Sequence, residues 1–183
     1  LICGKGYYTN RPSRATVCSA CGAGTFSVAQ SVKCTLCRAG TYSTTSSFEC
    51  RNCSLGFFTN LSGSAACTAC QAGFFAGFDG SSTCDACPEG FFSSASGQGA
   101  CESCAEGKYQ DRRGQLSCIE CGGGKYQSST ASTLCELCPV GYFASSTKSS
   151  KCDVCPEDSI SPDFGTISCA ICSHPTLTNG TNR

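Results

Sequence analysis

Ten Cys-x-x-Cys pairs follow one another at intervals of 16 or 17 residues, and this spacing constrains the fold more than any other feature of the chain. The pairs begin at residues 18, 34, 50, 67, 84, 101, 118, 135, 152 and 169, and one further cysteine, Cys3, precedes them. A short fixed period is typical of a repeat array, in which one small unit is stacked many times and contacts mainly its neighbours.

A glycine and an aromatic residue set the phase of the repeat. A glycine follows three residues after Cys3 and after the second cysteine of eight pairs, and an aromatic residue follows two residues later. These module aromatics are Tyr8, Phe26, Tyr42, Phe58, Phe75, Phe92, Tyr109, Tyr126 and Phe143. A module therefore reads Cys-x-x-Gly-x-Tyr/Phe, then roughly eight to ten small polar residues, then a closing cysteine.

The composition indicates that cysteine replaces an apolar core. Leu, Ile, Val and Phe total only 29 of 183 residues, which is too few for a chain of this length to fold by apolar burial alone. The 13 basic and 13 acidic residues balance, and there are 17 aromatic residues, which argues against disorder. With 21 cysteines the chain is typical of a disulfide scaffold, and such bonds persist in oxidising compartments. We therefore expect an extracellular or cell-surface protein.

Reading the modules in this phase pairs each opening cysteine with the cysteine that closes its loop. The predicted bridges are Cys3–Cys18, Cys21–Cys34, Cys37–Cys50, Cys53–Cys67, Cys70–Cys84, Cys87–Cys101, Cys104–Cys118, Cys121–Cys135, Cys138–Cys152 and Cys155–Cys169. Cys172 is left unpaired or pairs between chains. Sequence alone does not fix connectivity, so bridges that cross between adjacent pairs stay an alternative.

The predicted fold is a small disulfide-rich repeat of about ten short β-hairpin or loop modules with almost no helix. The glycine supplies a turn in which positive φ is cheap, and the core of each module is one disulfide and one aromatic ring. A second aromatic, present in modules such as those of Tyr7 and Phe57, is expected to pack on the next module. Two strands a module, about 4.8 Å apart, predict an elongated solenoid-like rod of order 100 Å.

The phrase Cys-x-x-Gly-x-Tyr/Phe with its closing Cys-x-x-Cys resembles the first module of tumour necrosis factor receptor cysteine-rich domains and, more closely, tandem ephrin-receptor-like repeats. The resemblance covers residues 3 to about 155, with "CQAGFFAGFDGSSTCDAC" (70–87) and "CPEGFFSSASGQGACESC" (87–104) as the best copies. It implies the sequential disulfide ladder above. The second receptor module type is missing, so that family's ligands are not implied. Asp158, Ile160, Pro175 and Leu177 depart from the pattern near the end.

The sequence favours a disulfide scaffold over a metal-binding protein or an enzyme. Repeated Cys-x-x-Cys pairs are also zinc-ribbon spacing, but the odd cysteine count and the even spacing favour disulfides, so no metal and no cofactor are predicted. The only histidine, His174, lies in a polar tail, and Arg112 with Arg113 lies in a loop. Glu157, Asp158 and Asp163 follow no calcium-loop pattern. We therefore expect no enzyme.

The neutral charge balance also argues against nucleic acid and anionic lipid as partners, because both need clustered Lys and Arg. No apolar run reaches the length of a membrane span. A leading Leu and the lack of Met suggest a processed product or a segment of a longer chain. Residues 3–172 form the predicted array, and 173–183 form a polar tail or the start of a further module.

Glycosylation is expected on asparagine sequons in an extracellular chain. Asn60-Leu-Ser and Asn179-Gly-Thr are the better acceptors, and Asn52-Cys-Ser is a poorer one because its middle residue is a bridged cysteine.

The modules vary without pattern in their loops, which favours a structural role. We expect a glycosylated, disulfide-stapled extracellular rod that serves as a filament or fibre subunit or as a surface spacer. It would associate with further copies through Cys172, or with neighbouring modules of a longer chain. The alternative is a ligand-binding or adhesion ectodomain of a receptor, with the aromatic stretch Phe74, Phe75, Phe78, Phe91 and Phe92 as its contact surface. A multi-zinc protein is the second alternative.

Overall fold

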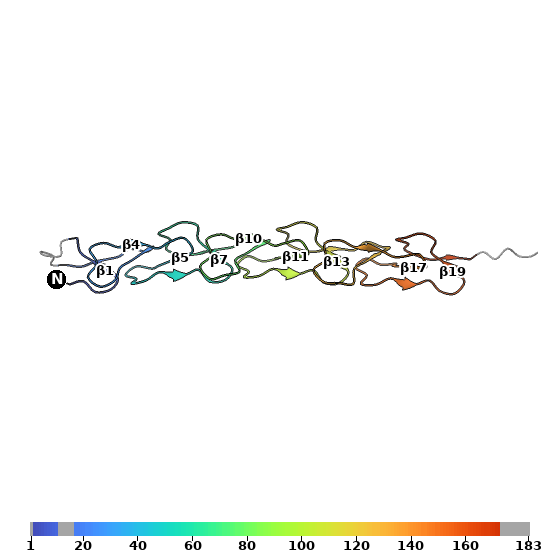
Figure 1. Ribbon diagram of the computed structural model, residues 1–183, viewed down its shortest axis with the longest axis horizontal. Helices are drawn as coiled ribbons and strands as arrows, with labels where there is room; N and C mark the ends of the chain where they lie inside the picture. The colour runs from blue at the N-terminus through green and yellow to red at the C-terminus, as the bar shows by residue number, and fades with distance from the viewer. Residues whose placement is uncertain (1, 11–16, 173–183) are drawn as a thin grey trace, which may run out of the picture. The chain divides into compact units, whose positions relative to one another are not determined.

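The computed structural model describes residues 2–10 and 17–172 of the chain (Figure 1). These form two compact units, Leu1–Ser103 with Arg112–Ser117, and Cys104–Asp111 with Cys118–Arg183. Each disulfide encloses one module, and we number the modules as hairpins 1 to 10 in chain order. Hairpin 7 contributes its strands and disulfide to the second unit and its loop, Arg112–Ser117, to the first.

Every hairpin consists of one antiparallel pair of two-residue strands. In the first unit β1 (Tyr7–Tyr8) pairs with β2 (Ser19–Ala20), β3 (Thr25–Phe26) with β4 (Thr35–Leu36), β5 (Thr41–Tyr42) with β6 (Arg51–Asn52), β7 (Phe57–Phe58) with β8 (Thr68–Ala69), β9 (Phe74–Phe75) with β10 (Asp85–Ala86), and β11 (Phe91–Phe92) with β12 (Glu102–Ser103). In the second unit β13 (Lys108–Tyr109) pairs with β14 (Ile119–Glu120), β15 (Lys125–Tyr126) with β16 (Glu136–Leu137), β17 (Tyr142–Phe143) with β18 (Asp153–Val154), and β19 (Ser159–Ile160) with β20 (Ala170–Ile171).

The sequence phrase explains both strands. The first strand follows the turn glycine and carries the module aromatic, as Phe57 and Phe58 follow Gly56 in β7. The second strand is the two residues between the cysteines of the next pair, so that Phe58 faces Thr68. The next opening cysteine extends this pairing, since the Cys70 N–H donates to the Gly56 carbonyl at 2.8 Å. A hairpin thus ends where the following one begins.

Ten disulfides close the hairpins, each between cysteines 13 to 15 residues apart. They join Cys3–Cys18, Cys21–Cys34, Cys37–Cys50, Cys53–Cys67, Cys70–Cys84, Cys87–Cys101, Cys104–Cys118, Cys121–Cys135, Cys138–Cys152 and Cys155–Cys169. These are the pairs that the phase of the repeat predicts. Their Cα–Cα distances of 5.6 to 5.8 Å lie within the usual range for disulfides.

The predicted fold class is confirmed: the structure is a small disulfide-rich repeat of ten two-stranded hairpins. Over residues 2–10 and 17–172 it contains no helix. Accordingly, within that part of the chain there is no helix that could cross a membrane.

The core of each unit is built from sulfur and small polar groups. The opening cysteines of hairpins 1 to 9 are at most 1 % exposed. The residue after the first strand is also buried, and it is a small or polar residue such as Ser27, Ser43 or Ala76. The module aromatics are only half-buried, so the expected core of one disulfide and one ring needs correction. The reason is that the strands that carry these rings are mostly exposed or half-buried themselves, so solvent reaches the rings.

Candidate functional site

Backbone hydrogen bonds join each hairpin to the next in a recurring pattern, seen for example between hairpins 2 and 3. The Gly24 N–H donates to the Ser43 carbonyl at 2.8 Å, and the Ser27 N–H donates to the Ser47 carbonyl at 3.3 Å. In return, the loop N–H of Ser46 donates to the Cys21 carbonyl at 2.8 Å. The same three bonds recur at hairpin junctions along both units. Stacking therefore depends on backbone groups, which every module has, and not on particular side chains.

The turn glycine also faces the loop of the second-next hairpin. Gly24 has φ +83°, and a Cβ there would overlap the carbonyl oxygen of Gly63 in hairpin 4. The glycine is thus required both by its own turn and by this close approach. The pairs of turn residue and facing loop residue are Gly6 with Ser46, Gly24 with Gly63, Gly40 with Gly80, Gly56 with Gly97, Gly73 with Gly114, Gly107 with Lys148, and Gly124 with Gly165.

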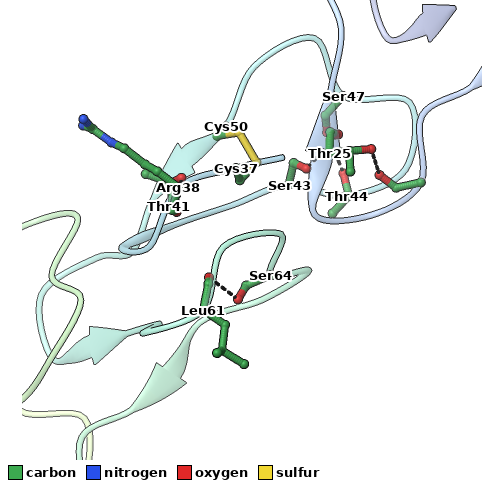
Figure 2. The surroundings of a disulfide bond; sticks show 11 residues. Thr25, Cys37, Arg38, Thr41, Ser43, Thr44, Ser47, Cys50, Leu61 and Ser64 are labelled. Atoms are coloured by element: carbon green, nitrogen blue, oxygen red, sulfur yellow. Dashed lines mark hydrogen bonds between the residues drawn. A yellow bond between two sulfur atoms is a disulfide. The ribbon is translucent and has the colours of Figure 1, made fainter. Parts of the chain in front are cut away.

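Buried hydroxyl groups add side-chain hydrogen bonds between neighbouring hairpins. The Ser43 hydroxyl donates to the Thr25 carbonyl of hairpin 2 at 2.9 Å, beside the Cys37–Cys50 disulfide (Figure 2). Ser27 makes the equivalent bond to the Tyr7 carbonyl at 3.0 Å. No buried side-chain nitrogen or oxygen in the described part of the chain lacks a partner. The interior is therefore polar but fully hydrogen-bonded, as a stable interior requires.

Two of the second aromatics, Phe57 and Phe74, lie against the loop of the second-next hairpin. They are 37 % and 38 % exposed. A Cβ at Gly97 in hairpin 6 would lie 3.7 Å from the Phe57 ring, and a Cβ at Gly114 in hairpin 7 would lie 3.9 Å from the Phe74 ring. The prediction named the next module only, and the second-next loop is a contact that it did not include.

Open grooves recur on the sides of the stack, at the same place in the repeat. Each is lined by a module aromatic and by the turn and closing cysteine of the next hairpin. The groove between hairpins 2 and 3 measures about 420 Å³ and is lined by residues that include Phe26, Leu36, Arg38 and Glu49. The groove between hairpins 9 and 10 measures about 460 Å³, and its lining includes Phe143, Glu157, Asp158 and Ile171.

Polar and charged side chains interact across strand pairs at the surface. Lys108 Nζ lies 3.4 Å from Glu120 Oε1, an ion pair between β13 and β14. The Tyr126 hydroxyl donates to Glu136 Oε2 at 2.9 Å across β15 and β16. This hydrogen bond, followed by burial and by the charge of Glu136, raises the pKa of Tyr126 above its usual value of 10.0. Lys5 lies over the Phe48 ring, 5.4 Å from its centre.

The residues weighed for metal or catalysis do not come together. Glu157, Asp158 and Asp163 are exposed in hairpin 10, and Arg112 and Arg113 are exposed in the loop of hairpin 7. In residues 2–10 and 17–172, no group of three or more His, Cys, Asp or Glu side chains is placed to hold a metal ion. Twenty cysteine sulfurs lie in disulfides, which are not thiolate ligands. His174, Pro175 and Leu177 lie outside the described residues.

The glycosylation sites differ in their surroundings. Asn60 is exposed at the start of the hairpin 4 loop, and both Leu61 and Ser62 of its sequon are exposed. Asn52 lies in β6 directly before the buried Cys53. Its side chain lies against Gly80, where a Cβ would meet the amide oxygen at 3.3 Å. Asn60 is therefore the better placed acceptor, and Asn179 lies outside the described residues.

Cys172 is the free cysteine of the described chain, and its side chain is exposed. Its N–H donates to the Asp158 carbonyl at 2.8 Å. Every bond of this kind elsewhere is made by an opening cysteine, as by Cys70 above. Cys172 therefore occupies the position of an opening cysteine, although it carries a thiol.

The aromatic stretch expected for a receptor surface is not uniformly exposed. Phe78 in the hairpin 5 loop is 80 % exposed. By contrast, Phe74 is 38 % exposed, and Phe75, Phe91 and Phe92 are half-buried within their hairpins. Of these five phenylalanines, Phe78 is the most exposed.

The loop residues that face the turn glycines were missed by sequence reasoning. They adopt positive φ in every hairpin whose loop is described, either as glycine, as at Gly63 and Gly165, or as another residue, as at Ser46 and Lys148. A second glycine midway through the loop recurs in five hairpins. That recurrence was the signal available in the sequence.

The comparison with protein families agrees with this architecture. The family model described as "Tyrosine-protein kinase ephrin type A/B receptor-like" matches residues 24–66, 56–94 and 90–134, which together span more than half of the chain. The chain belongs to this ephrin-receptor-like family. The matched ranges contain the turn glycines, module aromatics and disulfides of hairpins 3 to 7 in full. A search of curated proteins gave no match.

Membership in the ephrin-receptor-like family describes the repeat and not a kinase. The matched segments consist of disulfide-closed hairpins. Cysteine-rich repeats of this family are usually non-catalytic and typically extracellular, which agrees with ten disulfides in one chain. The match begins at hairpin 2 and ends in hairpin 8, so the family assignment rests on the regular part of the array.

Proposed function

We propose that this chain is an extracellular structural repeat protein, a subunit of a filament or fibre or a spacer at a surface. The observation that carries the proposal is the backbone contact that recurs, within each unit, between a hairpin and the hairpins that follow it. These contacts leave loop sequences free to vary, because they use carbonyl and N–H groups and one turn glycine. The described hairpins repeat one unit, and each unit contacts mainly its neighbours, so the length of such an array grows with the number of units.

The disulfides support this role. In the chain-entropy model a bridge that closes about 15 residues contributes roughly 3 kcal/mol, and each hairpin contains one. Each hairpin is thereby stabilised locally, without a large apolar core. An extracellular spacer benefits because local opening in one hairpin does not remove the bridges of the others. Glycosylation at Asn60 would keep the exposed loop of hairpin 4 hydrated.

The test uses the chain produced in an oxidising secretory compartment. Electron microscopy and light scattering over a range of concentrations should show fibres that dissolve when the disulfides are reduced. A spacer is tested by placing two, four or six hairpins between two fluorophores. The separation should rise by a constant increment per hairpin pair, whereas in a Gly/Ser linker of equal length it rises roughly with the square root of length. Monomers at every concentration together with square-root growth would overturn the proposal.

A further inference from the structure

The neutral net charge of the chain conceals two oppositely charged parts. Residues 1–70 contain six basic side chains and one acidic side chain, Glu49, a formal charge of +5. Residues 71–183 contain seven basic and twelve acidic side chains, a formal charge of −5. Two parts of equal and opposite charge make a chain electrostatically complementary to a second copy of itself.

The positive charge gathers at hairpin 3. Arg38 follows its opening cysteine, Arg51 follows its closing cysteine, and Lys33 lies just before it in hairpin 2; all three are exposed. We call these three residues the basic surface. None of them forms an ion pair with a described residue. Figure 2 shows the Arg38 side chain directed away from the Cys37–Cys50 disulfide and from Ser43.

Arg38 of the basic surface lines the groove between hairpins 2 and 3. Phe26 and Leu36 give this groove an apolar lining of a size that admits a side chain, and Glu49 lines it as well. At the position of Arg38 the next groove carries Ser54, which is uncharged. A partner carboxylate beside an apolar group would therefore meet a guanidinium in the groove of hairpins 2 and 3 and none in its neighbour.

The negative charge is concentrated at the end of hairpin 9 and in hairpin 10. Asp153 in β18 of hairpin 9 is exposed, as are Glu157, Asp158 and Asp163 in hairpin 10, and we call these four residues the acidic surface. Residues 152–172 contain no basic residue. The groove between hairpins 9 and 10 has an apolar lining from Phe143 and Ile171, and Glu157 and Asp158 line it as well. Ile171 is 85 % exposed. This groove occupies the same place in the repeat as the groove lined by Arg38 and Glu49, but its charged lining is acidic only.

We propose that the acidic surface of one copy binds the basic surface of a second copy. The inference rests on the proposed structural function and names the contact that would join its subunits. The contact is heterologous, because two different surfaces meet, so each bound copy still offers one free surface of each kind. Charge pairing at exposed surfaces mainly accelerates and orients association and weakens as salt rises. The balance of +5 against −5 favours a second copy over an external polyanion.

Charge-reversal variants test this contact. The first variant is Lys33→Glu/Arg38→Glu/Arg51→Glu, and the second is Asp153→Lys/Glu157→Lys/Asp163→Lys. Self-association is followed by sedimentation velocity at about 0.05 and 0.5 M NaCl. Each variant alone should associate at least roughly tenfold more weakly than the natural chain, because its two surfaces then carry the same sign. An equimolar mixture of both variants should recover association, because opposite surfaces meet again.

The matched control is Arg113→Glu/Lys125→Glu/Lys151→Glu. It changes the net charge as much as the first variant but leaves the basic surface intact, so its association should stay within about twofold of the natural chain at low salt. Circular dichroism and non-reducing peptide mapping establish that all variants keep their fold and disulfides.

Three results would overturn the contact. Fibres that are insensitive to salt and to every variant would leave the proposed function standing but place the joint elsewhere. Equal weakening by the control would reduce the effect to net charge. A monomeric natural chain whose basic surface binds a sulfated polysaccharide, with loss in the first variant only, would show an external polyanion as the partner.

Discussion

Gly124 and Gly141 occupy the same position in hairpins 8 and 9 but have different surroundings. Both have positive φ, +75° and +83°, and both donate their N–H to the following hairpin, at 2.8 and 2.9 Å. Gly124 is covered by the carbonyl of Gly165 from hairpin 10, whereas no described atom lies within 4 Å of a Cβ placed at Gly141. The difference separates the two reasons for glycine, namely the turn itself and the approach of the second-next hairpin.

Hairpin 10 shows that the turn alone tolerates a side chain. Asp158 stands where glycine stands elsewhere and adopts φ +59°. The opening cysteine is also less buried in hairpin 10 than in hairpin 8: Cys121 is 0 % exposed, whereas Cys155 is half-buried. Interior hairpins are therefore contacted by hairpins on both sides, and the last described hairpin is contacted by the preceding hairpins.

The largest loss of stability is expected from removing a disulfide, and we compare one variant that lacks an interior disulfide with another that lacks the disulfide of hairpin 10. Cys121→Ser/Cys135→Ser should lower the free energy of unfolding by about 3 kcal/mol through the open loop, with a further loss because the buried Cys121 site receives a hydroxyl. Cys155→Ser/Cys169→Ser should lower the free energy of unfolding by the same amount for the open loop, but without the additional cost of a buried hydroxyl, because Cys155 is only half-buried. Thermal unfolding and hydrogen exchange, in a Cys172→Ser background that prevents thiol exchange, measure both.

The two disulfide variants should also differ in how many hairpins show faster hydrogen exchange. Faster exchange should extend through hairpins 7 to 9 in the interior variant, because the Cys121 carbonyl accepts the Lys148 N–H of hairpin 9. In the end variant it should extend back only to hairpin 9, whose Gly141 and Ala144 N–H groups donate to carbonyls of hairpin 10. Equal spread in both variants would show that the hairpins are not coupled by these bonds.

The glycine comparison gives the second prediction. Gly141→Ala should cost about 1 kcal/mol, the usual penalty for a side chain at positive φ. Gly124→Ala adds an overlap with the Gly165 carbonyl, which is backbone and cannot move aside easily, so we expect about 3 kcal/mol or more. Thermal unfolding of both variants with intact disulfides gives the difference. Equal losses would mean that the turn is the only reason for glycine.

Much of the local fold could be predicted from the sequence, since it lies within one module. The spacing from Cys37 to Cys50 predicted a closed loop, and the position of Gly40 predicted a turn of positive φ, which is observed at +81°. Both signals involve residues fewer than 15 positions apart. The disulfide then restricts the loop so strongly that few other conformations are available.

Contacts between modules could not be predicted in the same way. Gly40 also faces the carbonyl of Gly80, which lies 40 residues later in the chain. This contact depends on how hairpins 3 and 5 stack, and neither glycine has a sequence property that identifies the other as its partner. The second-next packing of Phe57 was missed for the same reason. The different charged linings of two equivalent grooves, Arg38 with Glu49 in one and Glu157 with Asp158 in the other, also depend on how the hairpins stack.

The smallest effect concerns the surface of interior hairpin 8, where Tyr126 donates to Glu136 at 2.9 Å; the equivalent pair in hairpin 10 is Ile160 and Ala170. Because the folded chain raises the pKa of Tyr126 above 10.0, this pair stabilises the fold below the unfolded pKa and loses that stabilisation as pH rises through the folded pKa. Glu136→Gln removes the carboxylate, so the pKa should fall toward 10.0 while the melting temperature at pH 7 stays within about 1 °C.

Tyrosine ionisation is followed by ultraviolet absorbance, and subtraction of the Tyr126→Phe titration isolates this residue among six tyrosines. The Cys172→Ser background again keeps a thiolate from attacking the bridges at high pH. If Glu136→Gln lowered the melting temperature as much as Gly124→Ala does, the interior hairpins would depend on exposed side-chain pairs. This result would contradict the explanation of the difference between interior and end hairpins by backbone contacts. A shifted titration at constant melting temperature leaves the stacked backbone and the turn glycine as the features that distinguish interior from end.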